Sequence, residues 1–364
     1  MKAQIVVGLG FGDEGKGITT DYLCSQSENS LVVRFSGGQQ CGHNVCIGDN
    51  QHVHSNFGSG TLRGVSSFFS EHCTIYPNTM FEELIVLNKK AVNPILYLHP
   101  LAKITTPFDV LVNRVLEAQN NHGSCGLGIG TTMKRDLMGY KLSAIDLKHS
   151  SILRQKLDEI QTYYFSNFEF SAENLDWLEA ELEHFLNILP LLKYSIADYA
   201  LLQTYANIVF EGSQGVMLDQ HHGIFPHVTF ANTTSKNAIE ICDKLGINRR
   251  EIFYVTRCYL TRHGNGWMPN ENEIDLVNTE FEINTFNEHQ GNFRTGEIDY
   301  NLLNFALKID AIYAGNIDKN LVVTCLDQRR DFNFEYSEIK TAMKNYYESR
   351  SPFSENMALI KNVV

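Results

Sequence analysis

The first seventeen residues carry the densest chemistry in the chain. The apolar run 5–9 predicts a buried strand, and a loop with glycines, two acids and a lysine follows it. Glycines let a backbone approach a ligand closely and aim N–H groups at an anion, and Lys16 adds positive charge. A loop that only holds phosphate has no need of Asp13 and Glu14. We therefore expect magnesium or proton chemistry beside the phosphate.

Three interpretations of this loop are open: a P-loop, a dinucleotide-binding loop and a turn without a ligand. Residues 10–16 fit a P-loop, but Gly17 stands where a serine or threonine usually binds magnesium, so Asp13 could take that role. The glycine spacing also fits a dinucleotide fingerprint, which needs an acid after the second strand. The strand-like run 31–35 leads into Ser-Gly-Gly at 36–38 instead, which disfavours this reading. A glycine-rich turn without a ligand is the third reading.

A second polar loop, residues 36–44, follows the strand predicted at 31–35. Carboxyl ends of parallel strands share one sheet edge, so both loops can flank one ligand. His43 among glycines and amides suits a general acid or a phosphate ligand. An exposed loop histidine is the alternative, which the neighbouring first loop disfavours.

Two later loops have the same character. Residues 126–135 combine glycines, the hydroxyls of Thr131 and Thr132, and the cations Lys134 and Arg135, which suits a monoester phosphate. Residues 210–234 run from a strand through a Gly-Ser-Gln-Gly turn to a cluster of hydroxyls. A purely structural turn is the alternative there.

Two more glycine loops each contain one arginine, Arg262 in 261–266 and Arg294 in 290–296. An arginine between glycines often binds a carboxylate or phosphate through its planar fork of donors. A solvated surface arginine is the alternative.

The composition bounds the kind of protein. The 364 residues are 43% hydrophobic and 20% charged, which is typical of a globular protein. No apolar run reaches 18 residues, so we expect no membrane partner, and the net charge of −12 argues against nucleic acid. The N-terminal residues are predicted to form a strand of the fold, so we expect no signal peptide. Eight cysteines without a C-x-x-C pair predict free thiols and a cytoplasmic location.

Recurring apolar runs predict the elements that must position these loops. Strands are expected at 4–9, 31–35, 94–98, 207–210, 252–256 and 321–324. Helical stretches separate them, which favours an α/β fold with a large, mostly parallel central sheet flanked by helices and a P-loop-like N-terminal loop. We expect a single domain, 1–364, with a helical insertion around 136–205.

The clearest helix is predicted at 172–189, with Ser171 as its N-cap, and we expect it to pack over the sheet. Its apolar face is expected to comprise Leu175, Leu178, Leu182, Phe185, Leu186 and Leu189.

The order of these motifs resembles the adenylosuccinate synthetase family. This chain reads GDEGKG, GGQQCGHN, GIGTT, FEGSQGVMLD-x-x-HG-x-x-P-x-VT-x-x-NTT and TRHG-x-G, where the family shows WGDEGKG, GG-x-NAGHT, GTT, FEGAQG-x-LLD-x-x-HG-x-YP-x-VTSSNT and TR-x-G-x-G. The matches span about residues 5–330. The resemblance implies a homodimeric purine-biosynthetic ligase that joins inosine monophosphate (IMP) to aspartate with GTP and Mg²⁺.

The resemblance also implies roles for single residues. Asp13 would take the proton from purine N1 and bind Mg²⁺ together with the carbonyl of Gly42. His43 would stabilise the transferring phosphoryl group, and Lys16 would hold phosphate charge.

Three binding sets are implied as well. The set for the nucleoside monophosphate is Gln40, Thr131, Thr132, Arg135, Gln214, Thr229 and Asn232. The set for GTP is Gly12, Glu14, Gly15, Lys16, Gly17, Gly42, Asn44, Thr324 and Asp327. The set for the amino acid is Arg262, Arg294 and Thr295.

The chain departs from the family pattern at positions that leave alternatives open. Cys325 replaces the usual lysine of T-K-L-D, so either GTP or ATP can be the donor. Only Arg294 stands in a loop where the family has several arginines, so the amino acid can differ from aspartate. Phage relatives act on dGMP and replace the loop aspartate with a smaller residue, whereas Asp13 is present here. A nucleotide-binding regulator without turnover is the remaining alternative.

Overall fold

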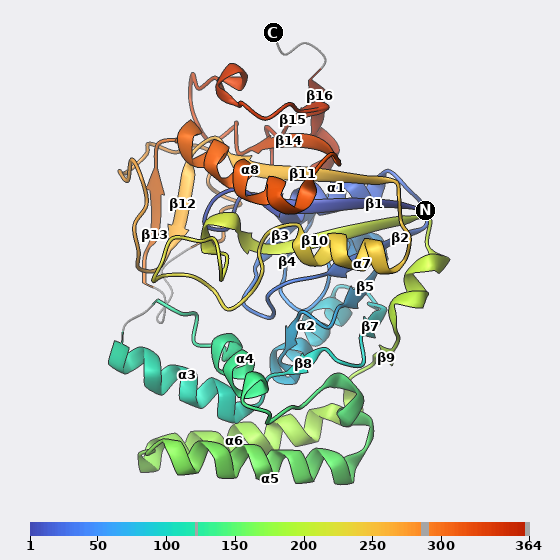
Figure 1. The fold of residues 1–364 in the computed structure, drawn as a ribbon, viewed down its shortest axis with the longest axis vertical. Coiled ribbons are helices and arrows are strands. Elements are labelled where there is room, and N and C mark those ends of the chain that lie inside the picture. Colours follow the sequence, from blue (N-terminus) through green and yellow to red (C-terminus); the bar gives the residue numbers. More distant parts are fainter. Residues whose placement is uncertain (121–122, 285–290, 361–364) are drawn as a thin grey trace.

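The computed structural model describes residues 1–120, 123–284 and 291–360. Its centre is a ten-stranded sheet in the order β16-β15-β14-β11-β1-β10-β2-β5-β7-β9 (Figure 1). Every pairing in it is parallel except that of β15 with β16. In chain order its strands are β1 (Lys2–Gly8), β2 (Ser30–Arg34), β5 (Ser66–Phe69), β7 (Leu96–Leu98), β9 (Ser195–Ile196), β10 (Asn207–Gly215), β11 (Arg250–Arg257), β14 (Asp318–Thr324), β15 (Asn345–Glu348) and β16 (Ala358–Ile360).

Helices and short strand pairs surround this sheet. The α-helices are α1 (Lys16–Ser25), α2 (Pro77–Lys89), α3 (Pro107–Asn120), α4 (Ile129–Leu137), α5 (Ser150–Asn167), α6 (Ala172–Ile188), α7 (Lys236–Lys244) and α8 (Tyr300–Ala314). The 3₁₀ turns are η1 (Thr61–Arg63), η2 (Ala144–Lys148), η3 (Leu189–Leu191), η4 (Tyr199–Thr204), η5 (Val216–Leu218), η6 (Tyr336–Glu338) and η7 (Ser354–Asn356). The short pairs are antiparallel β3 (His43–Ile47) with β4 (Asn50–His54), antiparallel β12 (Leu260–His263) with β13 (Phe293–Gly296), and parallel β6 (Thr74–Ile75) with β8 (Lys103–Ile104).

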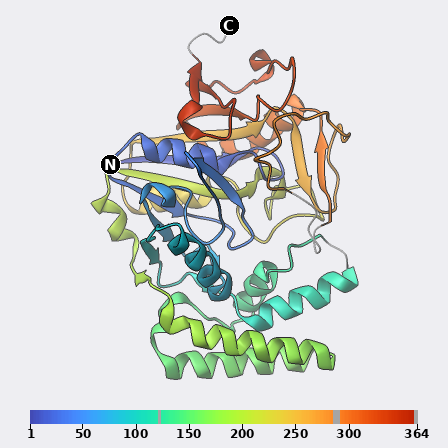
Figure 2. The same ribbon diagram turned by 180° about the vertical axis from the view of Figure 1, so that it is seen from behind.

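Alternating side chains of the strands serve the two faces of the sheet. In β1, Ile5 and Val7 pack in the core that includes side chains of α7 and α8, which lie in front of the sheet in Figure 1. Val6 points to the other face and packs with Leu23 of α1, the blue helix seen in front in Figure 2. The predicted parallel sheet is confirmed. A parallel strand is buried on both faces, and for this reason it appears in the sequence as a continuous apolar run.

The parallel register brings the chemically rich loops to one edge. Gly8 at the end of β1 lies opposite Gly215 of β10 and Val255 of β11. Arg34 at the end of β2 lies beside Glu211, and Thr324 at the end of β14 lies beside Arg257. The loops after these strands therefore face the same end of the sheet.

The predicted helix at 172–189 is present as α6, and the Ser171 hydroxyl caps it by accepting from the N–H of Asn174. Its expected packing was wrong. Residues of α6 contact α2 and α3, and α5 and α6 lie side by side away from the central strands (Figure 1). Only part of the expected apolar face is buried: Leu178 and Phe185 are, whereas Leu175 and Leu186 are about 40% exposed.

The segment 136–205 contains α5, α6 and one strand of the central sheet. That strand, β9, pairs with β7 at the sheet edge. All eight cysteines are free thiols. Among the described residues, no helix is long and apolar enough to cross a lipid bilayer.

Candidate functional site

A pocket opens at the carboxyl edge of the sheet, where the first and second loops meet. Asp13 and Lys16 reach it from the first loop, and Gly42 and His43 reach it from the second. Its full lining is Asp13, Gly15, Lys16, Gly17, Ile18, Gly42, His43, Asn44, Arg257, Asn278, Phe281, Glu282, Ile283, Asn284, Thr324, Cys325, Asp327, Gln328, Ser349, Ser351 and Pro352.

Glu14 shapes the first loop from inside. Its carboxylate accepts from the N–H groups of Gly10 and Gly12 at 3.0 and 2.8 Å and pairs with the ammonium of Lys16 at 2.5 Å. Both side chains of the ion pair are buried. Two of the loop amides are thus occupied by Glu14, which can explain why the loop carries an acid beside its lysine.

The close approach of the two loops explains the missing P-loop hydroxyl. A Cβ atom on Gly17 would lie 2.9 Å from the Cβ of His43. A serine or threonine at position 17 would therefore collide with the second loop. Glycine lets α1 begin directly against His43.

Asp13 stands at the mouth of this arrangement. Its backbone is left-handed, with φ of 62°, and its side chain is 25% exposed. Its carboxylate lies 3.4 Å from Nε2 of His263. The loop around it is fixed by Arg257, whose Nε donates to the carbonyl of Asp13, and by Thr261, whose hydroxyl donates to the carbonyl of Gly12.

His43 is oriented by a buried carboxylate. Its Nδ1 lies 2.7 Å from Oε1 of Glu211. The hydroxyl of Ser59 donates to the same oxygen, and the N–H of Ser59 donates to Oε2. Burial lowers the pKa of His43, against the opposing effect of Glu211. Burial alone would raise the pKa of Glu211, but His43, Arg34 and Ser59 lower it to about 2. A neutral imidazole that donates from Nδ1 to an ionised Glu211 leaves Nε2 for a ligand.

The donors at Asp13 and Gly42 fit a magnesium ion. The half-buried Asp13 and the exposed Gly42 line the same pocket and offer a carboxylate and a backbone carbonyl. Mg²⁺ prefers oxygen ligands and keeps several waters, so two protein oxygens with open space beside them are a suitable set.

The far end of the pocket lies beyond β14. The hydroxyl of Thr324 donates to the carbonyl of Glu14 at 2.6 Å, which ties this end to the first loop. Cys325 and Asp327 line the pocket, and burial raises the pKa of the Asp327 carboxyl. Asn44 lines it too, and its amide donates to the carbonyl of Phe281.

Of the monophosphate set, Gln40 and Gln214 contact each other through their side-chain amides at 3.3 Å. Thr229 and Asn232 are half-buried, and Asn232 hydrogen bonds to Gln220 and Asn237. None of these four lines the pocket described above.

The other three members of that set are committed to the protein. The hydroxyls of Thr131 and Thr132 both donate to the carbonyl of Gly128 at the start of α4. The Arg135 guanidinium is 1% exposed and pairs with Asp109 at 2.8 Å. To bind a phosphate, Arg135 would have to leave Asp109, and this would leave a buried carboxylate unpaired.

The amino-acid set lies on the β12–β13 pair, where Arg262 and Arg294 are cross-strand neighbours. The buried Arg262 donates to the carbonyls of Asn265, Trp267 and His227. Arg294 pairs with Glu271 and donates to the carbonyls of Gly264 and Gly266, and the Thr295 hydroxyl donates to the carbonyl of Asn272. The loop before β13 includes Gln290, which lies outside the described residues.

Sequence reasoning missed three contributors to the site. Glu211 lies within the motif that resembles the family's FEGAQG, but the resemblance assigns it no role. Arg257 ends β11, and the segment 278–284 closes one side of the pocket. Arg257 pairs with Glu282 at 2.5 Å. The position of Glu211 and Arg257 near the ends of apolar strands was the available signal.

These features define an open α/β protein with phosphate-type loops gathered at the carboxyl edge of its parallel strands. Comparison with known sequences narrows this class. The profile of the family described as adenylosuccinate synthetase matches residues 5–351, and the chain belongs to this family.

A sequence relative supports this family assignment. Adenylosuccinate synthetase from Thermodesulfovibrio yellowstonii is 30% identical over 285 residues, which cover 74% of this chain and 65% of the relative. The chain thus spans slightly less than two thirds of that relative's length.

Two solved structures share the fold. The fully ligated adenylosuccinate synthetase of Plasmodium falciparum has a TM-score of 0.79 at 20% identity, covering 99% of this chain and 100% of that one. The succinoaminodeoxyadenylate synthetase of cyanophage S-2L, bound to dGMP and dATP, has a TM-score of 0.68 at 15% identity, covering 98% and 95%.

Proposed function

We propose that this protein is a ligase that joins IMP to L-aspartate at the expense of GTP and gives adenylosuccinate, GDP and phosphate. One observation carries the proposal: Asp13, Lys16, Gly42 and His43, from two separate loops, line a single pocket. A proton acceptor, a phosphate-binding cation and an oriented imidazole are the groups that such a reaction needs at one point.

The chemistry follows from the substrate. The 6-oxygen of hypoxanthine is a poor leaving group, so it must first be phosphorylated. Asp13 accepts the proton of ring N1, which moves negative charge onto the 6-oxygen, and that oxygen attacks the γ-phosphorus of GTP. The amine of aspartate then displaces inorganic phosphate from carbon 6.

His43 and Lys16 act on the transferring phosphoryl group. His43 is held through Nδ1 by Glu211, so its Nε2 can meet the phosphoryl oxygens. Lys16 supplies fixed positive charge as the bond to GDP breaks. The carboxylate of Asp13 and the carbonyl of Gly42 would hold Mg²⁺, which neutralises phosphate charge when bound.

The remaining sets would select the substrates. Asp327 would accept from the two N–H groups of guanine, which adenine cannot offer together, so we favour GTP over ATP. Gln40, Gln214, Thr229 and Asn232 would hold the monophosphate nucleotide. For Arg262 and Arg294 to bind aspartate, they must exchange carbonyl and Glu271 partners for its carboxylates.

A purine other than hypoxanthine is the second candidate. The fold likeness to a phage synthetase bound to dGMP supports it. Asp13 speaks against it, since phage relatives carry a smaller residue there. Cys325 stands where the family usually has a lysine, and this difference leaves ATP as the alternative phosphate donor.

We further propose that this protein is a homodimer located in the cytoplasm, as members of the family are. Eight free thiols are compatible with a reducing compartment. Sedimentation equilibrium would test the dimer directly, and a single species at 41.3 kDa would contradict it.

The first experiment mixes purified protein with Mg²⁺, GTP, IMP and aspartate and follows adenylosuccinate by its ultraviolet absorbance. Parallel reactions replace IMP by dGMP, GTP by ATP, or aspartate by other amino acids. Turnover with the first mixture supports the proposal. Turnover with dGMP alone supports the second candidate, and GTP binding without any turnover supports a regulator.

A further inference from the structure

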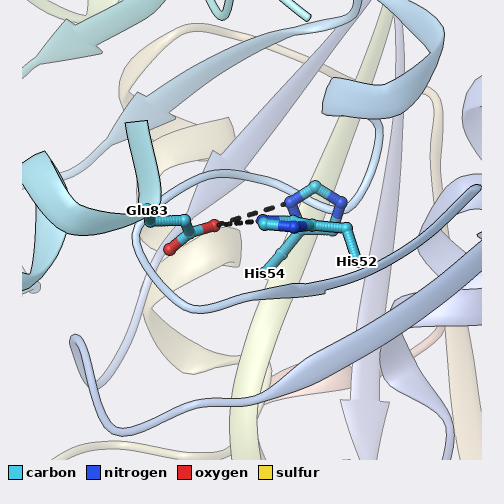
Figure 3. A group of neighbouring side chains, drawn as sticks. All are labelled: His52, His54 and Glu83. Carbon is cyan, nitrogen blue, oxygen red and sulfur yellow. Dashed lines mark hydrogen bonds and ion pairs between the residues drawn. The ribbon is translucent and has the colours of Figure 1, made fainter. Parts of the chain in front are cut away.

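A buried histidine–glutamate cluster lies on the hairpin that carries His43. His52 and His54 belong to β4, and Glu83 comes from α2. Successive side chains of a strand alternate between faces, so His52 and His54 share one. Figure 3 shows both imidazole rings facing the carboxylate of Glu83. All three residues are buried, and nothing in the proposed reaction uses them.

The distances match those between ligands of one small ion. Nε2 of His52 lies 3.2 Å from Oε1 of Glu83, and Nδ1 of His54 lies 3.7 Å from the same oxygen. The potential ligand atoms all lie within 4.8 Å of one another. Two ligands of a tetrahedral zinc ion at about 2.0–2.1 Å stand about 3.3 Å apart, so the observed spacings bracket that value.

His54 is a second, independent observation. Its side chain is wholly buried, yet neither ring nitrogen makes a hydrogen bond, and Nδ1 comes no closer than 3.7 Å to Oε1 of Glu83. A buried polar group without a partner is costly, about 1–3 kcal/mol, and native proteins rarely keep one without a reason. An ion bound at Nδ1 would supply that partner.

The carboxylate is already held in place for such a role. Oε2 of Glu83 accepts from the N–H groups of Ser55 and Asn56 and from the Asn56 amide. This fixes the carboxylate and leaves Oε1 to face the imidazoles. Ligands of protein metal sites are commonly oriented by such outer hydrogen bonds.

We propose that His52, His54 and Glu83 bind one divalent transition-metal ion, with Zn²⁺ the best fit. Two imidazoles and a carboxylate suit zinc, whereas Mg²⁺ and Ca²⁺ prefer oxygen ligands throughout. The site is separate from the magnesium ligands Asp13 and Gly42.

The ion would tie the hairpin to α2. His54 lies directly opposite His43 in the register of β3 and β4. A link from β4 to α2 would therefore stiffen the strand pair on which His43 stands. Its expected effect is on stability, because no atom of the cluster lines the reaction pocket.

The test uses untagged full-length protein, stripped with a chelator and then dialysed against Zn²⁺ with excess Mg²⁺ present. Bound zinc is counted by mass spectrometry after gel filtration, and Co²⁺ serves as an optical probe of nitrogen ligation. We expect about one zinc ion per chain and a rise in melting temperature, since an ion that binds only the folded state stabilises it.

The decisive variant is His52→Gln, which retains a side chain able to donate to Glu83. The matched control is His149→Gln, which removes an exposed histidine outside the cluster. We expect His52→Gln to lose the zinc and the rise in melting temperature, and His149→Gln and Asp13→Asn to keep both. Zinc-free wild-type protein, or equal zinc in His52→Gln, would overturn the proposal.

Discussion

At the scale of residues, the site depends on pairs that lie far apart in the sequence. His43 is aimed by Glu211, 168 positions later. Lys16 is held by Glu14, only two positions away. The local pair fixes the shape of the loop, and the distant pair fixes the direction of the imidazole. Loss of the local contact should therefore disturb the shape of the loop, whereas loss of the distant contact should misorient the imidazole of His43.

Replacing Asp13 tests its role as proton acceptor. Asp13→Ala should lower kcat by about 10²–10⁴-fold, the range that acid–base catalysis typically supplies, and leave monophosphate binding largely intact. Steady-state rates and calorimetric titration with IMP measure the two effects. Asp49→Asn, at an exposed turn, is the matched control. A rate within a few-fold of wild type would remove Asp13 from the mechanism.

Glu211 is a positioning residue, and its test separates orientation from folding. Glu211→Gln should lower kcat by about 10- to 100-fold, because a poorly oriented His43 stabilises the transferring phosphoryl group less well, while KM for GTP changes little. Ser59→Ala removes one hydrogen bond to the same carboxylate and should have a smaller effect. Equal losses in kcat for both variants, with lowered melting temperatures, would point to structure alone.

At the scale of elements, α6 shows where a periodic pattern is informative and where it is not. The capping residue Ser171 and the span of the helix follow from local sequence. Its packing partners do not, since a leucine face fits another helix as well as a sheet. The contacts with α2 and α3 leave Leu175 and Leu186 partly exposed.

Two leucines of α6 make a matched pair for this packing. Leu178 is 5% exposed and Leu175 is 39% exposed. Leu178→Ala should reduce the free energy of unfolding by about 2–5 kcal/mol, because it leaves a cavity. Leu175→Ala should cost less than about 1 kcal/mol. Urea unfolding measures both, and equal losses would contradict the packing described here.

At the scale of the whole molecule, stability should depend on pH through the half-buried His72. Burial lowers the pKa of His72 from 6.5 to about 4, and Lys103 and Lys244 add to this against the opposing effect of Glu71. The unfolded chain then binds more protons than the folded one between these values. The free energy of unfolding should fall as the pH drops from about 6.5 to about 4.

The variant His72→Gln isolates this effect. Removing the titrating group should flatten the fall in unfolding free energy between pH 7 and pH 5, measured by urea titration at each pH. His149→Gln, at an exposed histidine, should leave the slope unchanged. An unaltered slope in His72→Gln would show that His72 does not titrate abnormally.

The sequence by itself predicted six of the ten strands of the central sheet, the loops that follow them and the kinds of groups those loops carry. Short-range rules suffice for these features, because an apolar run and the glycines after it are read within about ten residues. The parallel sheet then follows from alternation of such strands with helices.

Only the tertiary structure decided which polar groups are free to act. Arg135 looked available from its loop, but Asp109, 26 positions earlier, holds it. Glu211 and the cluster of His52, His54 and Glu83 acquired their roles through the register of strands and the packing of α2. Such pairings depend on long-range contacts that bury both partners, and no local pattern specifies which acid will meet which base.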